Sequence, residues 1–146
     1  MLPKKKNKNK VVLNLVICFV LLILSLMIII FRQRIIDQIS IWQFTPSDEI
    51  VALVDRIKFS DEGKFYFYTS HPELESAADF NKSCNRIEST TSILGCFNNF
   101  KIYIYNVTDT RLDGIREVTA SHEMLHAVYQ RLSQNEKTEL NTLLEN

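Results

Sequence analysis

The sequence predicts one N-terminal transmembrane helix followed by a small α+β domain, and three features support this fold class. An apolar run covers residues 11–31, which is about the 20 residues that an α-helix needs to cross a bilayer. Helical periodicity then alternates with two short, aromatic-rich strand patterns. The part that remains, residues 45–146, is long enough for one compact domain.

The apolar run indicates an uncleaved signal anchor, because it is longer than a secretory signal and no small-residue cleavage site follows it. Five lysines in residues 1–10 form a basic head, which the positive-inside rule keeps in the cytoplasm. We therefore expect a single-pass protein of the cell membrane, in contact with the bilayer through residues 11–31, with its C-terminal domain extracytoplasmic. The alternative is a buried helix of a soluble domain. This alternative is disfavoured, because such helices rarely lack charged residues over so long a span.

The overall charge is balanced, with 17 basic and 17 acidic side chains, so no nucleic-acid partner is expected. Residues 32–44 are predicted to be a juxtamembrane linker. Helix 46–58 is predicted next, with Thr45 as N-cap and an apolar face. After a turn at 61–63, the alternating aromatic residues of Lys64–Thr69 predict a strand.

The second half of the domain is predicted from similar patterns. A short helix should follow Pro72 and end near Asn81, and a polar loop should cover residues 85–94. Lys101–Tyr105 is predicted to be the second strand. A long helix should cover residues 113–132, and Ser133 with Glu136 has the spacing of a capping box that begins a last helix.

Two cysteines of the domain, Cys84 and Cys96, form an even pair. On the oxidising side of a membrane they could form a disulfide. Two buried thiols are the alternative. A role as zinc ligands is less favoured, because metal-binding cysteines usually occur in close C-x-x-C pairs. Cys18 lies within the apolar run, where it is interpreted as a small apolar residue.

The long helix carries the residues with the clearest chemistry. His122 and His126 are four residues apart, so their rings should project from the same side of the helix, one turn apart. Two imidazoles in that arrangement can bind one metal ion, and Glu123 would lie beside a metal-bound water. The sequence therefore predicts a Zn²⁺ site with Glu123 as catalytic base. Histidines held by ordinary hydrogen bonds are the alternative.

The stretch from Thr119 to Val128, TASHEMLHAV, resembles the active-site helix of the zincin metallopeptidases (H-E-x-x-H). More loosely, the whole chain resembles uncharacterised bacterial membrane proteins that have one N-terminal span and a small zincin-like domain. The resemblance implies a zincin-like fold for residues 45–146, with His122 and His126 as zinc ligands and Glu123 as general base. It also implies that a strand beside the helix, here Lys101–Val107, is the edge strand that pairs with an extended peptide substrate.

Gluzincins, one branch of that group, take a third ligand from a following helix. Glu145, nineteen residues after His126, is the candidate, if the last two helices form a hairpin. A solvated acid at the end of the helix is the alternative for Glu145. The last helix reaches Leu143 and Leu144 without a cap or a closing element, which also fits a domain truncated at its C-terminus, with the third ligand beyond this point.

These features lead to two hypotheses. The first is a membrane-anchored zinc-dependent peptidase that hydrolyses a peptide or protein substrate outside the cytoplasm. The second is a non-catalytic, membrane-anchored binding or envelope domain that retains the zincin fold, as a truncated and inactive member of the group would.

Overall fold

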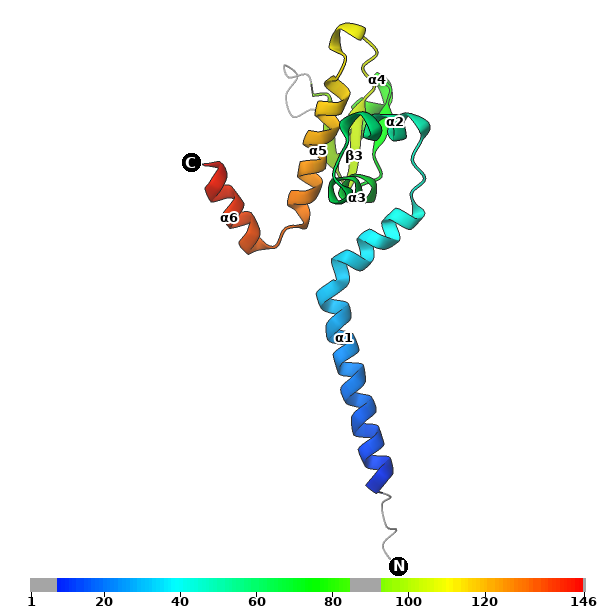
Figure 1. The fold of residues 1–146 in the computed structure, drawn as a ribbon, viewed down its shortest axis with the longest axis vertical. Helices are drawn as coiled ribbons and strands as arrows, with labels where there is room; N and C mark the ends of the chain where they lie inside the picture. The colour runs from blue at the N-terminus through cyan, green and yellow to red at the C-terminus, as the bar shows by residue number, and fades with distance from the viewer. Residues whose placement is uncertain (1–7, 85–92, 146) are drawn as a thin grey trace, which may run out of the picture. The chain divides into compact units, whose positions relative to one another are not determined.

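The computed structural model describes residues 8–84 and 93–145, and the chain divides into two compact units with a boundary between Ile36 and Asp37. Helix α1 (Lys8–Gln43) begins in the first unit and ends in the second (Figure 1). Residues 11–31 are exposed along their whole length, and α1 is long and apolar enough to cross a membrane. A helix suited to spanning a membrane is thus confirmed, whereas its orientation stays a prediction.

The end of α1 belongs to the second unit. Asp37 is buried, and the Ser40 hydroxyl donates a hydrogen bond to the carbonyl oxygen of Thr69 at 2.9 Å. His71 Nε2 lies 2.9 Å from the Ser40 carbonyl oxygen, and the His71 ring stacks on Phe44 with centroids 4.9 Å apart. In the predicted linker, Asp37, Ser40 and Phe44 therefore contact the domain, whereas Trp42 is 76% exposed.

The rest of the second unit contains five α-helices, three strands and one 3₁₀ turn among the described residues (Figure 1). In chain order these are α2 (Asp48–Ile57), α3 (Asp61–Thr69), β1 (Glu73–Glu75), α4 (Ala77–Ser83), β2 (Gly95–Asn98), β3 (Lys101–Tyr105), η1 (Thr110–Leu112), α5 (Ile115–Arg131) and α6 (Gln134–Leu144). The α+β class is confirmed at this level, with one small sheet.

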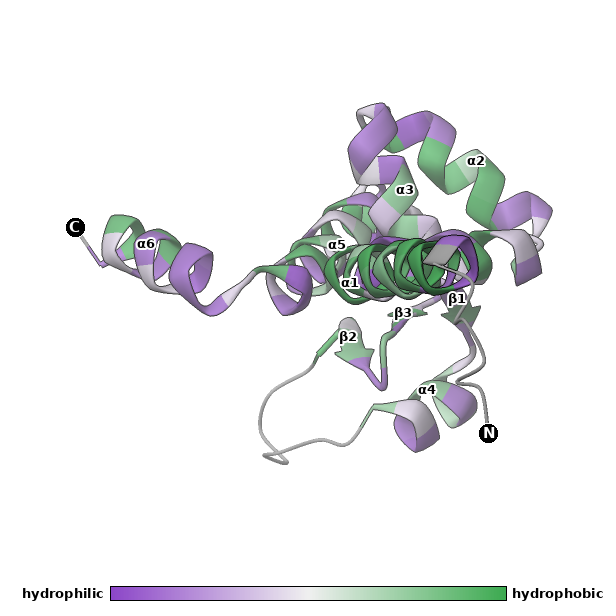
Figure 2. Cartoon of the chain, turned by 90° about the horizontal axis from the view of Figure 1, so that it is seen from below, coloured by the Kyte–Doolittle hydropathy of each residue, from purple (hydrophilic) through white to green (hydrophobic). Residues whose placement is uncertain are grey.

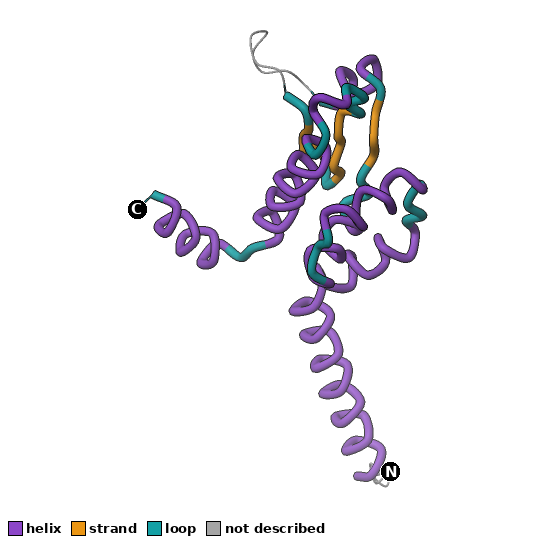
Figure 3. The backbone as a smooth tube through the Cα atoms, turned by 45° about the horizontal axis from the view of Figure 1, so that its top comes forward, coloured by secondary structure: helices purple, strands orange, loops and turns teal. Residues whose placement is uncertain are grey.

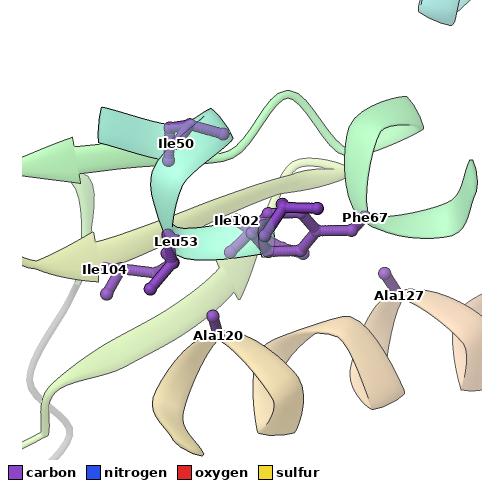
Figure 4. Close-up of a cluster of buried hydrophobic side chains, with 8 residues drawn as sticks. Ile50, Leu53, Phe67, Ile102, Ile104, Ala120 and Ala127 are labelled. Carbon is purple, nitrogen blue, oxygen red and sulfur yellow. The ribbon is translucent and has the colours of Figure 1, made fainter. Parts of the chain in front are cut away.

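Strand β3 is the centre of the sheet. It pairs with β1 in parallel and with β2 in antiparallel orientation, so the strand order is β1-β3-β2. Ile102 and Ile104 point to one face of the sheet, where the core is formed together with residues of α2, α3 and α5 (Figure 4). On the opposite face α4 packs its Phe80 against Tyr105 of β3, with ring centroids 5.9 Å apart (Figure 2).

The predicted strand Lys64–Thr69 is wrong, because these residues form the greater part of helix α3. The Ser60 hydroxyl accepts a hydrogen bond from the Gly63 amide, and two acidic residues occupy the first turn. Both features stabilise a helix start. Phe67 then faces the core while its aromatic neighbours are half-buried, so the alternating aromatics do not mark a strand.

Three other expectations need correction. The helix predicted to follow Pro72 is a short strand, β1, and then helix α4. Lys101–Val107 was expected to supply the edge strand, but β3 is the central strand, and the edge beside α5 is β2 (Figure 3). Helix α2 begins after an N-cap at Ser47 and not at Thr45. Residues 85–92 of the predicted loop lie outside the described residues.

The long helix, the last helix and the disulfide agree with the predictions. The side chain and backbone of Ser133 form both hydrogen bonds of a capping box with Glu136. Cys84, after α4, is bonded to Cys96 of β2, which attaches the edge strand to the helix on the far face of the sheet.

Removal of the disulfide is expected to lower the free energy of unfolding by about 3 kcal/mol, because the bond closes a loop of twelve residues in the unfolded chain. The measurement is denaturant unfolding of the Cys84→Ala/Cys96→Ala double variant. Cys18→Ser is the matched control, since Cys18 has no disulfide partner and its replacement should leave unfolding of the domain unchanged. Equal stability of the double variant and the wild type would contradict the prediction.

Candidate metal centre

Helix α5 places the two histidines of the motif side by side. It begins after Gly114, which has φ +91°, a conformation that glycine adopts without steric cost. The helix continues unbroken to Arg131, so His122 and His126 lie one turn apart. Their rings are exposed, with centroids 4.7 Å apart and planes at 83°. The two histidine side chains therefore project from the same side of α5, as their spacing predicted.

The reactive nitrogens of the two rings converge. Nε2 of His122 and Nε2 of His126 are 3.1 Å apart. Two nitrogen ligands of one tetrahedral zinc ion, at bonds of about 2.05 Å, would be separated by about 3.3 Å. The same distance also suits an N–H···N hydrogen bond between two neutral rings. The distance between the two nitrogen atoms is therefore close to that expected for either arrangement.

Glu123 lies on a different side of α5, toward the sheet. Its side chain is buried at 6% exposure. Burial raises the pKa of the Glu123 carboxyl, while the positive charge that His126 and His122 can carry acts in the opposite direction. A carboxylate that is removed from water has a higher proton affinity than an exposed glutamate. Such a group is suited to accepting a proton at neutral pH.

The edge strand β2 passes unusually close to Glu123. A Cβ atom built on Gly95 would lie 2.5 Å from Thr119 Cγ2, 2.8 Å from Glu123 Cγ and 2.9 Å from Glu123 Oε1. Only glycine allows the strand to approach the helix so closely. Gly95 therefore determines how the Glu123 carboxylate is held between helix and strand, a role that the sequence alone did not indicate.

Gly95→Ala is expected to destabilise the domain by about 1–3 kcal/mol, because the added methyl group overpacks the contact between β2 and α5. Chemical denaturation measures the effect. Gly63→Ala is the matched control: its Cβ would keep at least 3.4 Å from its neighbours, and alanine within helix α3 should stabilise by about 0.5–1 kcal/mol. The same change in stability for both variants would contradict the close approach at Gly95.

The C-terminal end of α5 is fixed by a buried ion pair that the sequence analysis missed. Arg131 Nη2 lies 3.0 Å from Asp37 Oδ1, and the two side chains are only 7% and 4% exposed. Arg131 also donates hydrogen bonds to Thr69 Oγ1 at 3.1 Å and to the carbonyl oxygen of Ala127 at 2.8 Å. The helix that carries both histidines is thereby attached to the last turns of α1.

The structure does not bring Glu145 to the histidines. In the described residues 8–84 and 93–145, no group of three or more His, Cys, Asp or Glu side chains is arranged to hold a metal ion. Glu145 is the C-cap of α6. That helix contacts α5 through a hydrogen bond from the Tyr129 hydroxyl to Asn141 Oδ1, at 3.2 Å. The role of Glu145 as a third ligand stays a prediction.

No protein-family model matches the chain, and no curated protein or solved structure is similar to it. The function must therefore be inferred from the geometry of His122, Glu123 and His126 and from the elements that hold them.

Proposed function

We propose that this protein is a membrane-anchored, zinc-dependent peptidase with His122 and His126 as metal ligands and Glu123 as general base. The observation that carries the proposal is the 3.1 Å separation of the two Nε2 atoms, with a buried carboxylate on the next residue of the same helix. Histidine nitrogens are common zinc ligands, and both rings are open to solvent. A metal ion and a substrate can therefore reach them.

His122 and His126 supply only part of the ligand set of a catalytic zinc site. Two nitrogen donors converge, whereas a catalytic site normally has three protein ligands and one water. Glu145 remains the candidate for the third position in this proposal, and a movement of α6 would be required to bring it in. Zinc bound to the two imidazoles would polarise a peptide carbonyl and lower the pKa of a bound water.

Glu123 supplies the proton chemistry. Its carboxylate takes a proton from the attacking water and passes it to the leaving amine, a function helped by the raised pKa that burial gives this group. The close approach of Gly95 leaves the Glu123 side chain little room to move.

The edge strand β2 positions the substrate. Within residues 8–84 and 93–145 it pairs with β3 alone, so its other edge can offer backbone groups to an extended peptide. A peptide added there would run along α5, because β2 packs on that helix next to Glu123. This assigns to β2 the role that we had first predicted for Lys101–Val107.

We propose that the site lies outside the cytoplasm. Helix α1 is suited to spanning a membrane, the lysines before it favour an N-terminus in the cytoplasm, and the disulfide between Cys84 and Cys96 is typical of an oxidising compartment.

The test is hydrolysis of a broad peptide library by the full-length protein in lipid nanodiscs. We expect cleavage that a zinc chelator abolishes and added zinc restores. Absence of any cleavage in the presence of bound zinc would overturn the peptidase proposal. It would favour a non-catalytic membrane-anchored binding domain, for which the missing third ligand among the described residues is the supporting observation.

A further inference from the structure

A pocket lies at the end of the edge strand, close to the histidine pair. It has a volume of about 300 Å³ and is lined by Phe97, Asn98, Asn99, Phe100 and Gln130. The first four residues form the end of β2 and the turn into β3, and Gln130 belongs to α5. The volume is at the lower end of the range for ligand pockets and suits one large side chain.

The lining of this pocket is uncharged and combines two phenyl rings with three carboxamide side chains. The rings of Phe97 and Phe100 meet edge to face, with centroids 6.3 Å apart and planes at 84°. Asn98 Nδ2 donates to the Ser83 carbonyl oxygen at 3.1 Å, which fixes one wall. Two phenyl rings and carboxamide groups can hold a flat, neutral side chain, whereas nothing in this lining would neutralise a charged one.

Phe100 has a conformation that favours a binding role over a purely structural one. Its φ is +62°, in the left-handed region, where a bulky residue costs about 1–3 kcal/mol. A glycine or asparagine would complete this two-residue turn with less strain. The ring is nevertheless 54% exposed, so core packing alone does not account for an aromatic residue at this position.

The distance along the helix relates the pocket to the proposed site. Gln130 follows His126 by four residues, so it lies on the same side of α5, about 6 Å further along the axis. Strand β2 runs beside this part of α5 from Gly95, next to Glu123, to Asn98 at the pocket. The step from Glu123 to Gln130 along α5 is about 10 Å, and an extended peptide advances about 3.3 Å per residue, so the step corresponds to three residues.

We propose that this pocket is a specificity subsite for an uncharged aromatic side chain located about three residues from the scissile bond. The proposal rests on the peptidase function for the position of the peptide, but binding at the subsite does not require turnover. It narrows the substrate class to peptides with tyrosine or phenylalanine at that position.

The test measures binding and cleavage separately. Full-length Glu123→Gln protein in nanodiscs is presented with peptides that differ only in carrying Tyr, Phe, Ala, Glu or Lys at one position, and cleavage sites are mapped with the wild type. We expect the aromatic peptides to bind about tenfold more tightly than the alanine peptide, and cuts to cluster about three residues away from the aromatic side chain.

Phe100→Asn is the informative variant, because asparagine tolerates the positive φ and so preserves the turn. It should reduce the ratio of aromatic to alanine binding to about one. The matched control Leu112→Asn, which removes an exposed apolar side chain outside the pocket, should leave that ratio as in the wild type.

Equal binding of all peptides, or an aromatic preference that survives in Phe100→Asn, would overturn the subsite. Aromatic-selective binding by a wild-type protein that cuts no peptide would support the subsite and overturn the peptidase function, so the two failures can be told apart.

Discussion

Arg131→Leu is expected to lower the free energy of unfolding by about 3–5 kcal/mol, because it removes the guanidinium that pairs with the buried carboxylate of Asp37. The variant also loses the hydrogen bonds that Arg131 donates to Thr69 and Ala127. Denaturant unfolding followed by circular dichroism measures the change. Since the ion pair joins the end of α5 to residues at the end of α1, release of the domain from α1 should also expose residues 37–44 to protease.

The control for this experiment is Arg111→Leu. Arg111 pairs with Asp109 at 2.6 Å, but its side chain is 86% exposed, and exposed ion pairs contribute about 0–1 kcal/mol. If Arg131→Leu unfolds at the same denaturant concentration as Arg111→Leu, then the contact with Asp37 does not stabilise the end of α5.

Glu123→Gln is expected to reduce kcat/KM for peptide hydrolysis by about 100- to 10,000-fold, the usual contribution of a general base. The amide has nearly the shape of the carboxylate, so it fits the space beside Gly95 but cannot accept the proton of the attacking water. Zinc should stay bound, because Glu123 is not one of the proposed ligands.

Glu117→Gln is the matched control, because Glu117 lies on the same helix and pairs with Arg56 at 3.0 Å, away from the two histidines. It should keep the wild-type rate of hydrolysis. Equal kcat/KM of Glu123→Gln and the wild type would remove Glu123 from the mechanism, and a loss of zinc in Glu123→Gln would mean that it acts through the metal site and not as a base.

The sequence was sufficient where the structure depends on local geometry. The arrangement of His122 and His126 follows from a spacing of four residues on an uninterrupted helix, and the capping box at Ser133 follows from two residues three positions apart. The apolar run predicted a helix able to span a membrane for the same reason, since its length and composition alone decide that property.

The errors arose where local patterns competed or where distant segments meet. The aromatic alternation in Lys64–Thr69 indicated a strand, but the N-cap at Ser60 and the burial of Phe67 determine a helix. Strand β2 has four residues, too few for a periodic pattern to emerge. Its place at the edge of the sheet follows from its pairing with β3, and the close approach of Gly95 to α5 is likewise a tertiary contact that no local pattern encodes.

The ion pair that anchors α5 was not predictable for a related reason. Asp37 and Arg131 are 94 positions apart in the chain, and each is located at the end of a helix where a charged residue is usually solvated. Their contact depends on how the end of α1 packs on the domain. The spacing of residues within α1 or within α5 gives no information about that packing.

The most direct test of the proposed metal centre is the zinc content of the purified full-length protein in nanodiscs, after equilibration with zinc and removal of the unbound ion. We expect about one zinc ion per chain in the wild type and in His71→Asn, which alters the one histidine outside the motif, and almost none in His122→Ala or His126→Ala. A wild type without zinc, or zinc that persists in both alanine variants, would contradict the assignment of these two imidazoles as the metal ligands.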